Sequence, residues 1–200
     1  MNWLSPDSKF MEAWNNTTDG ILINLLMLLT SIPLVTIGAA LAAGNETARK
    51  TLQGEGNSVV RTYWASYKSN LGKATLLWLP YLLIGIALVG MWAFLHEPWA
   101  MVIEIFLSIM WILGFEWTFA VQARFDNTVA RTWINAFVFA LSNPLFTALL
   151  IIIDVTFIFI IVGTVMYLPP ALFLVIVFGY GSMLMLHVPF TERAFSRYIQ

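Results

Sequence analysis

Five long apolar stretches occupy most of the 200-residue chain, and they constrain its fold more than any other feature. The stretches cover residues 20–41, 74–95, 99–121, 145–167 and 171–188. A helix needs about 20 residues to cross a hydrocarbon core about 30 Å thick. Backbone groups cannot stay unpaired in lipid, so stretches this continuous must be helices rather than barrel strands. The sequence therefore predicts an all-α membrane protein, in which residues 1–200 form a single transmembrane domain with five transmembrane helices.

The composition supports this prediction and excludes several functions. Hydrophobic residues make up 60% of the chain and charged residues 10%, against about 25% charged in a soluble domain. The near balance of basic and acidic residues gives no nucleic-acid footprint. Cysteine is absent, which excludes disulfides and thiolate catalysis. No phosphate-loop or zinc-protease motif occurs, and His96 and His187 are expected on opposite sides of the membrane. We therefore expect no enzymatic activity, no metal site and no cofactor.

The positions of the basic residues predict the orientation in the membrane. Only Lys9 precedes the first predicted span, whereas the loop after it holds five Lys and Arg residues. The loop after the third span and the C-terminal tail hold two each, and the other two connections hold none. Basic loops stay in the cytoplasm. This distribution predicts an N-terminus outside the cell and a C-terminus inside.

Two cytoplasmic interfacial amphipathic helices are predicted, at residues 59–69 and 128–141. Apolar residues recur there at helical spacing, as in Val129, Trp133 and Phe137, and basic residues nearby can reach lipid headgroups. We expect Asp126 or Asn127 to cap the second helix. Glycine follows the first of these helices, at Gly72, and proline follows the second, at Pro144.

Polar side chains inside the apolar stretches are the candidate functional residues. Glu104, Glu116 and Asp154 are acidic residues within predicted spans, where a charge is costly and usually faces a bundle interior or a watery cavity. Asp154 lies farthest from either interface. Asn24 is one of several polar residues in the first span. The alternative for each acid is a structural role, as a protonated group that hydrogen-bonds a neighbouring helix.

A stripe of polar residues runs along the third span and includes Glu104, Ser108, Thr118 and Gln122. Glu116 lies about 120° around the helix from Glu104, so the two acids do not form a simple proton path. Polar stripes of this kind more often bind another helix.

Small residues mark a candidate packing or partner interface. Pro33 should kink the first span, Thr36 follows the kink, and Gly38 and Ala42 belong to a small-residue face that lets helix backbones approach closely. A second candidate interface is formed by Arg124, Asp126 and Asn127. One interpretation is a helix cap with a local ion pair, and the other is docking of a cytoplasmic partner. Packing or capping is the simpler explanation in both cases.

Several segments together resemble the YesL family of small bacterial membrane proteins. They are Ser31–Ala40 (SIPLVTIGAA), preceded by Asp19 and Asn24, then Tyr63–Asn70 (YWASYKSN), Ala123–Thr128 (ARFDNT) and Asn135–Phe137 (NAF). Members of that family are often encoded beside carbohydrate-uptake ABC transporters and polysaccharide-degrading enzymes, mostly in Gram-positive bacteria. The resemblance implies a multi-pass protein of the cell membrane of a Gram-positive bacterium, without implying a mechanism.

Three functions remain open at this point. The first is an accessory membrane protein that associates with the permease subunits of a carbohydrate ABC importer and modulates or stabilises it. The second is an independent small transporter or channel, self-associating into an oligomer, which uses its intramembrane acidic residues. The third is a membrane-anchored scaffold without a ligand. In each case the lipid bilayer is the main partner, and no nucleic acid is involved.

Overall fold

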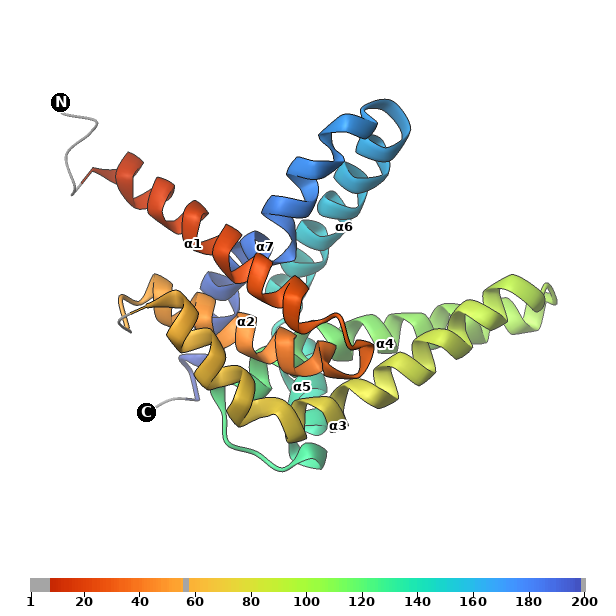
Figure 1. The fold of residues 1–200 in the computed structure, drawn as a ribbon. Helices are drawn as coiled ribbons and strands as arrows, with labels where there is room; N and C mark the ends of the chain where they lie inside the picture. Colours follow the sequence, from red (N-terminus) through yellow and green to blue (C-terminus); the bar gives the residue numbers. More distant parts are fainter. Residues whose placement is uncertain (1–7, 56–57, 199–200) are drawn as a thin grey trace.

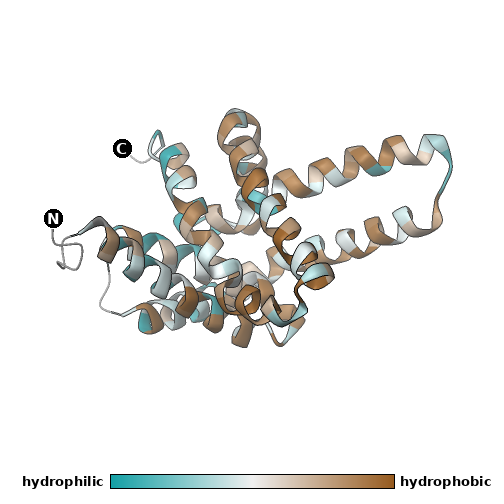
Figure 2. Ribbon diagram, turned by 90° about the horizontal axis from the view of Figure 1, so that it is seen from above, coloured by the Kyte–Doolittle hydropathy of each residue, from teal (hydrophilic) through white to brown (hydrophobic). Residues whose placement is uncertain are grey.

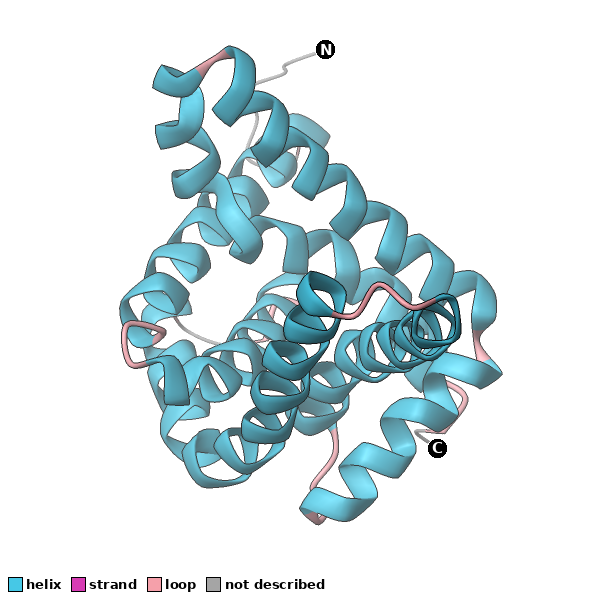
Figure 3. Cartoon of the chain, turned by 90° about the vertical axis from the view of Figure 1, so that its right-hand side faces the viewer, coloured by secondary structure: helices cyan, strands magenta, loops and turns pink. Residues whose placement is uncertain are grey.

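The computed structural model describes residues 8–55 and 58–198, and this part of the chain is almost entirely helical, with no strand. Short connections join the helices (Figure 3). In chain order the elements are α1 (Lys9–Thr30), η1 (Leu34–Thr36), α2 (Ile37–Leu52), α3 (Val59–Phe94), α4 (Pro98–Arg124), α5 (Val129–Ser142), α6 (Pro144–Tyr167), η2 (Pro169–Ala171) and α7 (Leu172–Phe195).

The predicted first span, residues 20–41, is not one helix. Helix α1 ends at Thr30, and the chain turns back so that α2 packs beside α1 (Figure 1). Pro33 causes the break, because proline has no backbone N–H and disfavours helical geometry in the residue before it. Thr36 stabilises the turn: its hydroxyl lies 2.7 Å from the Thr30 carbonyl oxygen and 2.8 Å from that of Pro33. The kink predicted at Pro33 is therefore a full reversal of the chain.

The predicted interfacial helix at 59–69 is also not a separate element. Helix α3 runs without interruption from Val59 to Phe94, through Gly72 and through Pro80. Its 36 residues extend about 54 Å, far more than the roughly 30 Å of a hydrocarbon core. Glycine lowers helix stability but does not prevent helical geometry, so Gly72 does not end the helix.

The second predicted interfacial helix is a separate element, α5, with almost the predicted bounds. Thr128 caps it, since the Thr128 hydroxyl accepts a hydrogen bond from the Arg131 backbone N–H at 3.3 Å. The expected cap at Asp126 or Asn127 was therefore wrong by one or two residues. Asn143 ends α5, and Pro144 begins α6, as suits a residue without a backbone donor at the first helical position.

Four helical stretches are long and apolar enough to cross a membrane: Val59–Phe94, Pro98–Arg124, Pro144–Tyr167 and Pro169–Phe195. They form two hairpins, α3–α4 and α6–α7; in Figure 1 the first projects to the right and the second upward, and both chain ends lie at the left. The hairpin arms are mostly hydrophobic, whereas hydrophilic residues gather near the chain ends and at the tip of the α3–α4 hairpin (Figure 2). This is the architecture of a multi-pass membrane protein.

The core lies where the bases of the hairpins meet α1, α2 and α5. One buried cluster joins α1, α2, α3 and α7 and includes Ile23, Tyr63, Leu77 and Leu184. A second cluster joins α4, α5, α6 and α7 around Trp117. Away from this core the hairpin arms expose large apolar side chains; Val89 on α3 and Phe159 on α6 are each 71% exposed. Such exposure is the expected state of a surface that faces lipid or another membrane helix.

Candidate functional site

Asn24 fills a break in helix α7. Gly179 has a positive φ of 37° and interrupts the helical geometry of α7, which frees backbone groups on either side. The Asn24 amide nitrogen donates to the carbonyl oxygens of Ile176 at 2.8 Å and Val177 at 3.1 Å, and its oxygen accepts from the Gly181 N–H at 3.2 Å. Asn24 is only 2% exposed. It therefore replaces the hydrogen bonds that the break removes from the helix.

Glycine is required at both positions that face Asn24. A Cβ atom at Gly179 would overlap the Asn24 side-chain amide, and one at Gly181 would overlap the Asn24 backbone. The close approach of α1 to α7 thus depends on these two glycines. The sequence shows Asn24 as a polar residue of a predicted span but does not predict the break in α7.

The structure brings Glu116 and Asp154 together and adds His187 to them. Glu116 on α4 and Asp154 on α6 lie close enough for the charges of their carboxyl groups to affect each other. His187 on α7 places its Nε2 atom 3.2 Å from Asp154 Oδ1. The ring of Tyr180 packs edge-on against the His187 ring, with centroids 6.3 Å apart. Three helices therefore each contribute an ionisable group to one cluster.

Sequence reasoning missed His187, although a signal for it was present. Asp154 lies 16 residues before Pro170, and His187 lies 17 residues after it. Because α6 and α7 form an antiparallel hairpin that turns at Pro170, residues equally distant from the turn lie side by side. His187 was instead assigned to the inner end of the last predicted span, without comparison with the facing helix.

Glu104 does not belong to this cluster. It lies twelve residues before Glu116 on α4, which is about 18 Å along the helix. Its side chain is 1% exposed, and its Oε1 atom has no hydrogen-bond partner in the described part of the chain. The three acidic candidates are therefore two sites rather than one.

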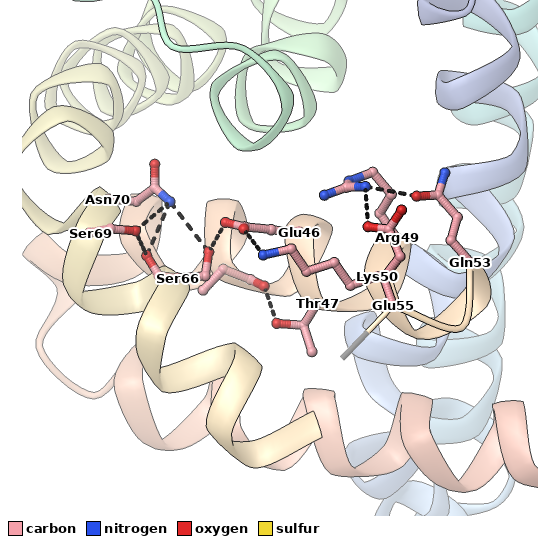
Figure 4. Close-up of polar contacts among 10 residues, drawn as sticks. Glu46, Thr47, Arg49, Lys50, Gln53, Glu55, Ser66, Ser69 and Asn70 are labelled. Carbon is pink, nitrogen blue, oxygen red and sulfur yellow. Dashed lines mark hydrogen bonds and ion pairs between the residues drawn. The ribbon is translucent and has the colours of Figure 1, made fainter. Parts of the chain in front are cut away.

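A polar network joins the base of α2 and α3 to α4 and α5. Ser66 donates to Glu46, which also pairs with Lys50 at 2.5 Å, and Asn70 donates to the Ser66 carbonyl oxygen at 3.1 Å (Figure 4). Gln122 then donates to Asn70 Oδ1 at 2.9 Å. Hydrogen bonds between buried side chains of different helices hold a helix bundle together in the membrane. Neither Glu46 nor this network was predicted from the sequence.

The polar stripe on α4 contacts α3, as the sequence predicted. The Thr118 hydroxyl lies 2.8 Å from the Tyr81 hydroxyl, and Trp92 donates to Ser108 Oγ at 3.2 Å. Together with the Gln122 bond to Asn70, these contacts extend along most of the α3–α4 pair. The stripe therefore serves helix packing.

The small-residue face at the start of α2 also packs inside the chain. A Cβ atom at Gly38 would overlap the backbone of Ala74 and the side chain of Trp78 on α3. Ala42 is fully buried and belongs to a cluster with Ala39 and Ala74. Of the two readings given for Gly38 and Ala42, packing applies, because α3 already covers this face. Pro33 is exposed in the turn, and Thr36 is half-buried there.

Arg124 is the last residue of α4, and Asp126 and Asn127 lie in the connection between α4 and α5. Arg124 and Asp126 pair with other helices rather than with each other. Arg124 Nε lies 3.3 Å from Glu192 Oε1 on α7, and Asp126 pairs with Lys73 on α3 at 2.6 Å. The pKa of Asp126 is lowered by its hydrogen bond to Lys73 and by the positive charge of Lys73. Asn127 is half-buried, and its backbone N–H donates to the Phe125 carbonyl oxygen at 3.0 Å.

The described part of the chain also contains two hollows of notable size. One is an apolar groove of about 540 Å³ along the α3–α4 hairpin, which we call the aromatic groove; its lining includes Trp78, Tyr81, Gly85, Trp92 and Trp111. The other is a polar hollow of about 320 Å³ at the ends of α1, α2 and α3, lined by residues such as Asp19, Lys50, Glu55 and Thr62. Partial burial raises the pKa of Asp19. Neither hollow is lined by Glu116 or Asp154.

Among the described residues, no group of three His, Cys, Asp or Glu side chains is arranged to hold a metal ion. The fold and its contacts define a small all-helical membrane protein with a buried ionisable cluster and an open aromatic groove. Residues 21–90, which run from α1 into α3, match a family model described as "Protein of unknown function, DUF624". No curated protein and no solved structure matches the chain.

Proposed function

We propose that this protein is an accessory membrane subunit that docks beside the permease subunits of a carbohydrate ABC importer and stabilises or modulates it. The main observation that supports this proposal is the aromatic groove. It lies on the α3–α4 hairpin, whose arm projects away from the other helices (Figure 1), and its open side is formed by large apolar side chains. We expect its occupant to be a transmembrane helix of the partner.

The shape and chemistry of the groove suit a helix. Gly85 leaves space between α3 and α4, and Trp78, Trp92 and Trp111 provide large, rigid walls. Aromatic residues in pockets of this kind contribute most of the energy of protein interfaces. The indole N–H groups of Trp92 and Trp111 are already bonded, to Ser108 and to the Tyr81 carbonyl oxygen, so the walls present no unpaired donor to an apolar partner.

The choice of a carbohydrate importer as partner rests on the resemblance to the YesL family. The segments that carry this resemblance include residues within the range 21–90 that matches the family of unknown function. The same resemblance supports a location in the cell membrane of a Gram-positive bacterium.

A groove-filling variant tests the proposal. Gly85→Leu places a side chain in the aromatic groove, where a Cβ atom meets only the Trp111 ring at ordinary contact distance. We expect the wild type to co-purify with permease subunits from the native host in mild detergent, and Gly85→Leu to lose them at unchanged thermal stability. Gly90→Leu is the matched control, because Gly90 lies on the same helix with open space around it and outside the groove. Equal recovery of partners with Gly85→Leu would contradict this docking site.

A second candidate function is an independent oligomeric transporter, and the cluster of Glu116, Asp154 and His187 favours it. Buried ionisable groups inside a membrane domain commonly mark an ion or substrate path. Purified protein in liposomes would test this: uptake of substrate by a homo-oligomer, abolished in Asp154→Asn, would replace the accessory role. The location of both hollows away from these acids makes the accessory role the better supported of the two.

For the topology we propose four membrane crossings with both chain ends in the cytoplasm. The reversal at Pro33 supports this arrangement, because it removes the continuous first span. All ten Lys and Arg residues then fall on one side of the membrane, and the two outer turns, at residues 95–97 and 168–170, have none. The five-span arrangement with an external N-terminus leaves Lys9 on the opposite side and remains the alternative. In both arrangements α5 and the start of α3 lie at the inner surface.

A further inference from the structure

The four proposed crossings leave the first apolar stretch without a place in the membrane. No charged residue lies between Asp19 and Glu46, so residues 20–45 form one uncharged run that the reversal at Pro33 divides into two arms. The arm in α1, residues 20–30, is about 16 Å long, and the arm in α2, residues 37–45, is about 13 Å long. Each arm therefore reaches only about halfway through a hydrocarbon core about 30 Å thick.

The second half of α1 is apolar on both of its faces. Ile23 is fully buried on the side that packs against the protein. Leu25, Leu28 and Leu29 are exposed and share one face, because residues three and four apart are neighbours on a helix. Ile32 continues this row into the turn and is 74% exposed. A helix that is apolar all round lies in a protein core or in a membrane, and here the chain itself covers only one face.

The turn between the arms supplies its carbonyl oxygens with donors from within the protein. The Thr36 hydroxyl lies 2.7 Å from the Thr30 carbonyl oxygen, and the Thr36 backbone N–H donates to that of Pro33 at 2.9 Å. The Trp78 indole N–H on α3 donates to the Leu34 carbonyl oxygen at 2.8 Å. A turn in water can leave such groups to the solvent, whereas a turn in lipid must pair them within the protein.

The bond to Trp78 also places the turn beside the membrane-crossing part of α3. Lys73 is the last charged residue of α3, and Trp78 lies five residues further along, which is about 7–8 Å. Gly38, at the start of α2, packs against the Trp78 side chain as well. Leu76 is exposed at this level, so the turn adjoins the lipid-facing surface of α3. In Figure 1 the turn lies at the right-hand end of α1 and α2, the direction in which the α3–α4 hairpin projects.

We propose that residues 20–45 form a re-entrant hairpin, which enters the membrane from the cytoplasmic side, reverses at Pro33 inside the hydrocarbon core and leaves on the same side. Its exposed face, Leu25, Leu28, Leu29 and Ile32, binds lipid acyl chains. Acyl chains suit this surface because its side chains carry no charge and the turn carbonyls already have donors. The proposal rests on the cytoplasmic N-terminus proposed above, and it does not depend on the docking role of the aromatic groove.

Fluorescence quenching at single cysteines tests the depth of the hairpin, since the natural chain has no cysteine. Ile32→Cys and Leu28→Cys would be labelled with bimane in vesicles of phosphatidylethanolamine and phosphatidylglycerol. We expect lipids with a doxyl group midway along the acyl chain to quench both labels, and iodide in the water to quench them several-fold less than a label at Thr18→Cys. Thr18 is the matched control, because it lies on the same helix, is exposed and precedes Asp19.

A membrane-impermeant maleimide tests the side of entry. Thr18→Cys, before the hairpin, and Arg61→Cys, after it, are both exposed, and both should react in inverted membrane vesicles and not in intact cells. Reaction of Thr18→Cys in intact cells would mean that the run crosses the membrane, and would overturn the hairpin. Iodide quenching at Ile32→Cys as strong as at Thr18→Cys would place the turn in water. Protection of Ile32→Cys from both quenchers would show that protein covers the tip, and each of these two results would also overturn the proposal. A failure of partner docking in the Gly85→Leu experiment would leave all these measurements unchanged.

Discussion

At the scale of single residues, the contact between Asn24 and the break in α7 shows how one side chain can make a strained backbone stable. A bend at Gly179 inside an apolar helix leaves carbonyl and N–H groups without partners, and each would be costly in lipid. Asn24 has two donor hydrogens and an acceptor, and it uses all three on α7. No other uncharged side chain except Gln offers this combination.

The first prediction concerns Asn24. Asn24→Ala removes three hydrogen bonds and leaves buried backbone groups unpaired, so it should lower the free energy of unfolding by about 1–3 kcal/mol. Asn15→Ala, on an exposed part of the same helix, should change the stability little. Thermal unfolding in mild detergent, followed by circular dichroism, measures both. Equal stability of the two variants would show that the Asn24 bonds have no net effect.

The second prediction concerns Gly179. Gly179→Ala introduces a side chain at positive φ, which costs roughly 1–2 kcal/mol, and also overlaps the Asn24 amide, so a larger loss of stability is expected. Gly163→Ala on α6 is the control. Its Cβ atom meets nothing within 4 Å, and alanine favours a helix over glycine by about 1 kcal/mol, so it should be neutral or stabilising. A stable Gly179→Ala protein would mean that α7 can straighten without Asn24.

At the scale of elements, two of the prolines lie where helices end, whereas the helix breaker Gly72 does not interrupt α3. Pro33 reverses the chain and Pro144 separates α5 from α6, while α3 continues through Gly72. Pro80 and Pro189 lie inside helices that continue past them. Pro33 lies in a turn that the Thr36 hydroxyl bonds, and Pro144 occupies the first position of α6, where its missing N–H removes no helical hydrogen bond.

The exposed face of α5 gives a prediction about its place in the membrane. Trp133 belongs to the apolar face predicted for this interfacial helix, but it stacks on Tyr81 with ring centroids 4.6 Å apart, so it faces the core. Ile134, Val138 and Leu141 form the exposed apolar face instead. Spin labels at Ile134→Cys and Leu141→Cys should therefore show contact with lipid-soluble relaxation agents, and a label at the exposed Arg131→Cys should show contact with water-soluble ones. The natural chain has no cysteine, so labelling is specific. Water access at all three positions would exclude an interfacial α5.

The ion pair between Lys73 and Asp126 predicts a pH dependence. It links α3 to the connection between α4 and α5 and lowers the pKa of Asp126 below that of the unfolded chain. Its contribution to stability is therefore present above the unfolded pKa, about 3.9, and is lost as the pH falls through the lowered value in the folded protein. The melting temperature of Asp126→Asn should be slightly below that of the wild type at about pH 6, and the two should converge toward about pH 3.

Because Asp126 is exposed, added salt at about pH 6 should reduce this difference. Glu97→Gln serves as the control, since Glu97 is exposed and lies outside the ion pairs of the described residues. A difference that persists at low pH would assign the effect of Asp126→Asn to something other than the ion pair.

At the scale of the whole molecule, two apolar hairpins project from a shared base that holds the polar contacts (Figures 1 and 2). Both chain ends lie at the left of Figure 1, whereas the tip of α3–α4 lies at the right and that of α6–α7 at the top. The four proposed crossings predict that reporters fused to the N-terminus and the C-terminus are both cytoplasmic. A reporter at residue 96 should be external. An external N-terminal reporter together with a cytoplasmic C-terminal one would favour five crossings and would contradict the four-crossing proposal.

The sequence by itself determined that this is a helical multi-pass membrane protein, because the length of an apolar stretch and the need to pair backbone groups in lipid are local properties. Four of the five predicted stretches lie within helices long enough to span, and α5 was predicted almost to the residue. The polar stripe on α4 was also recognised as a packing surface. Periodicity along one helix was enough for these conclusions.

Only the tertiary structure decided the rest, because it depends on which faces of different helices meet. Whether Pro33 bends or reverses the chain depends on the contact of α2 with α1 and α3, where Gly38 packs. The break at Gly179 exists because Asn24, 155 residues earlier, supplies its hydrogen bonds. His187 joins Asp154 because α6 and α7 are antiparallel, a relation between helices that no single stretch of sequence contains.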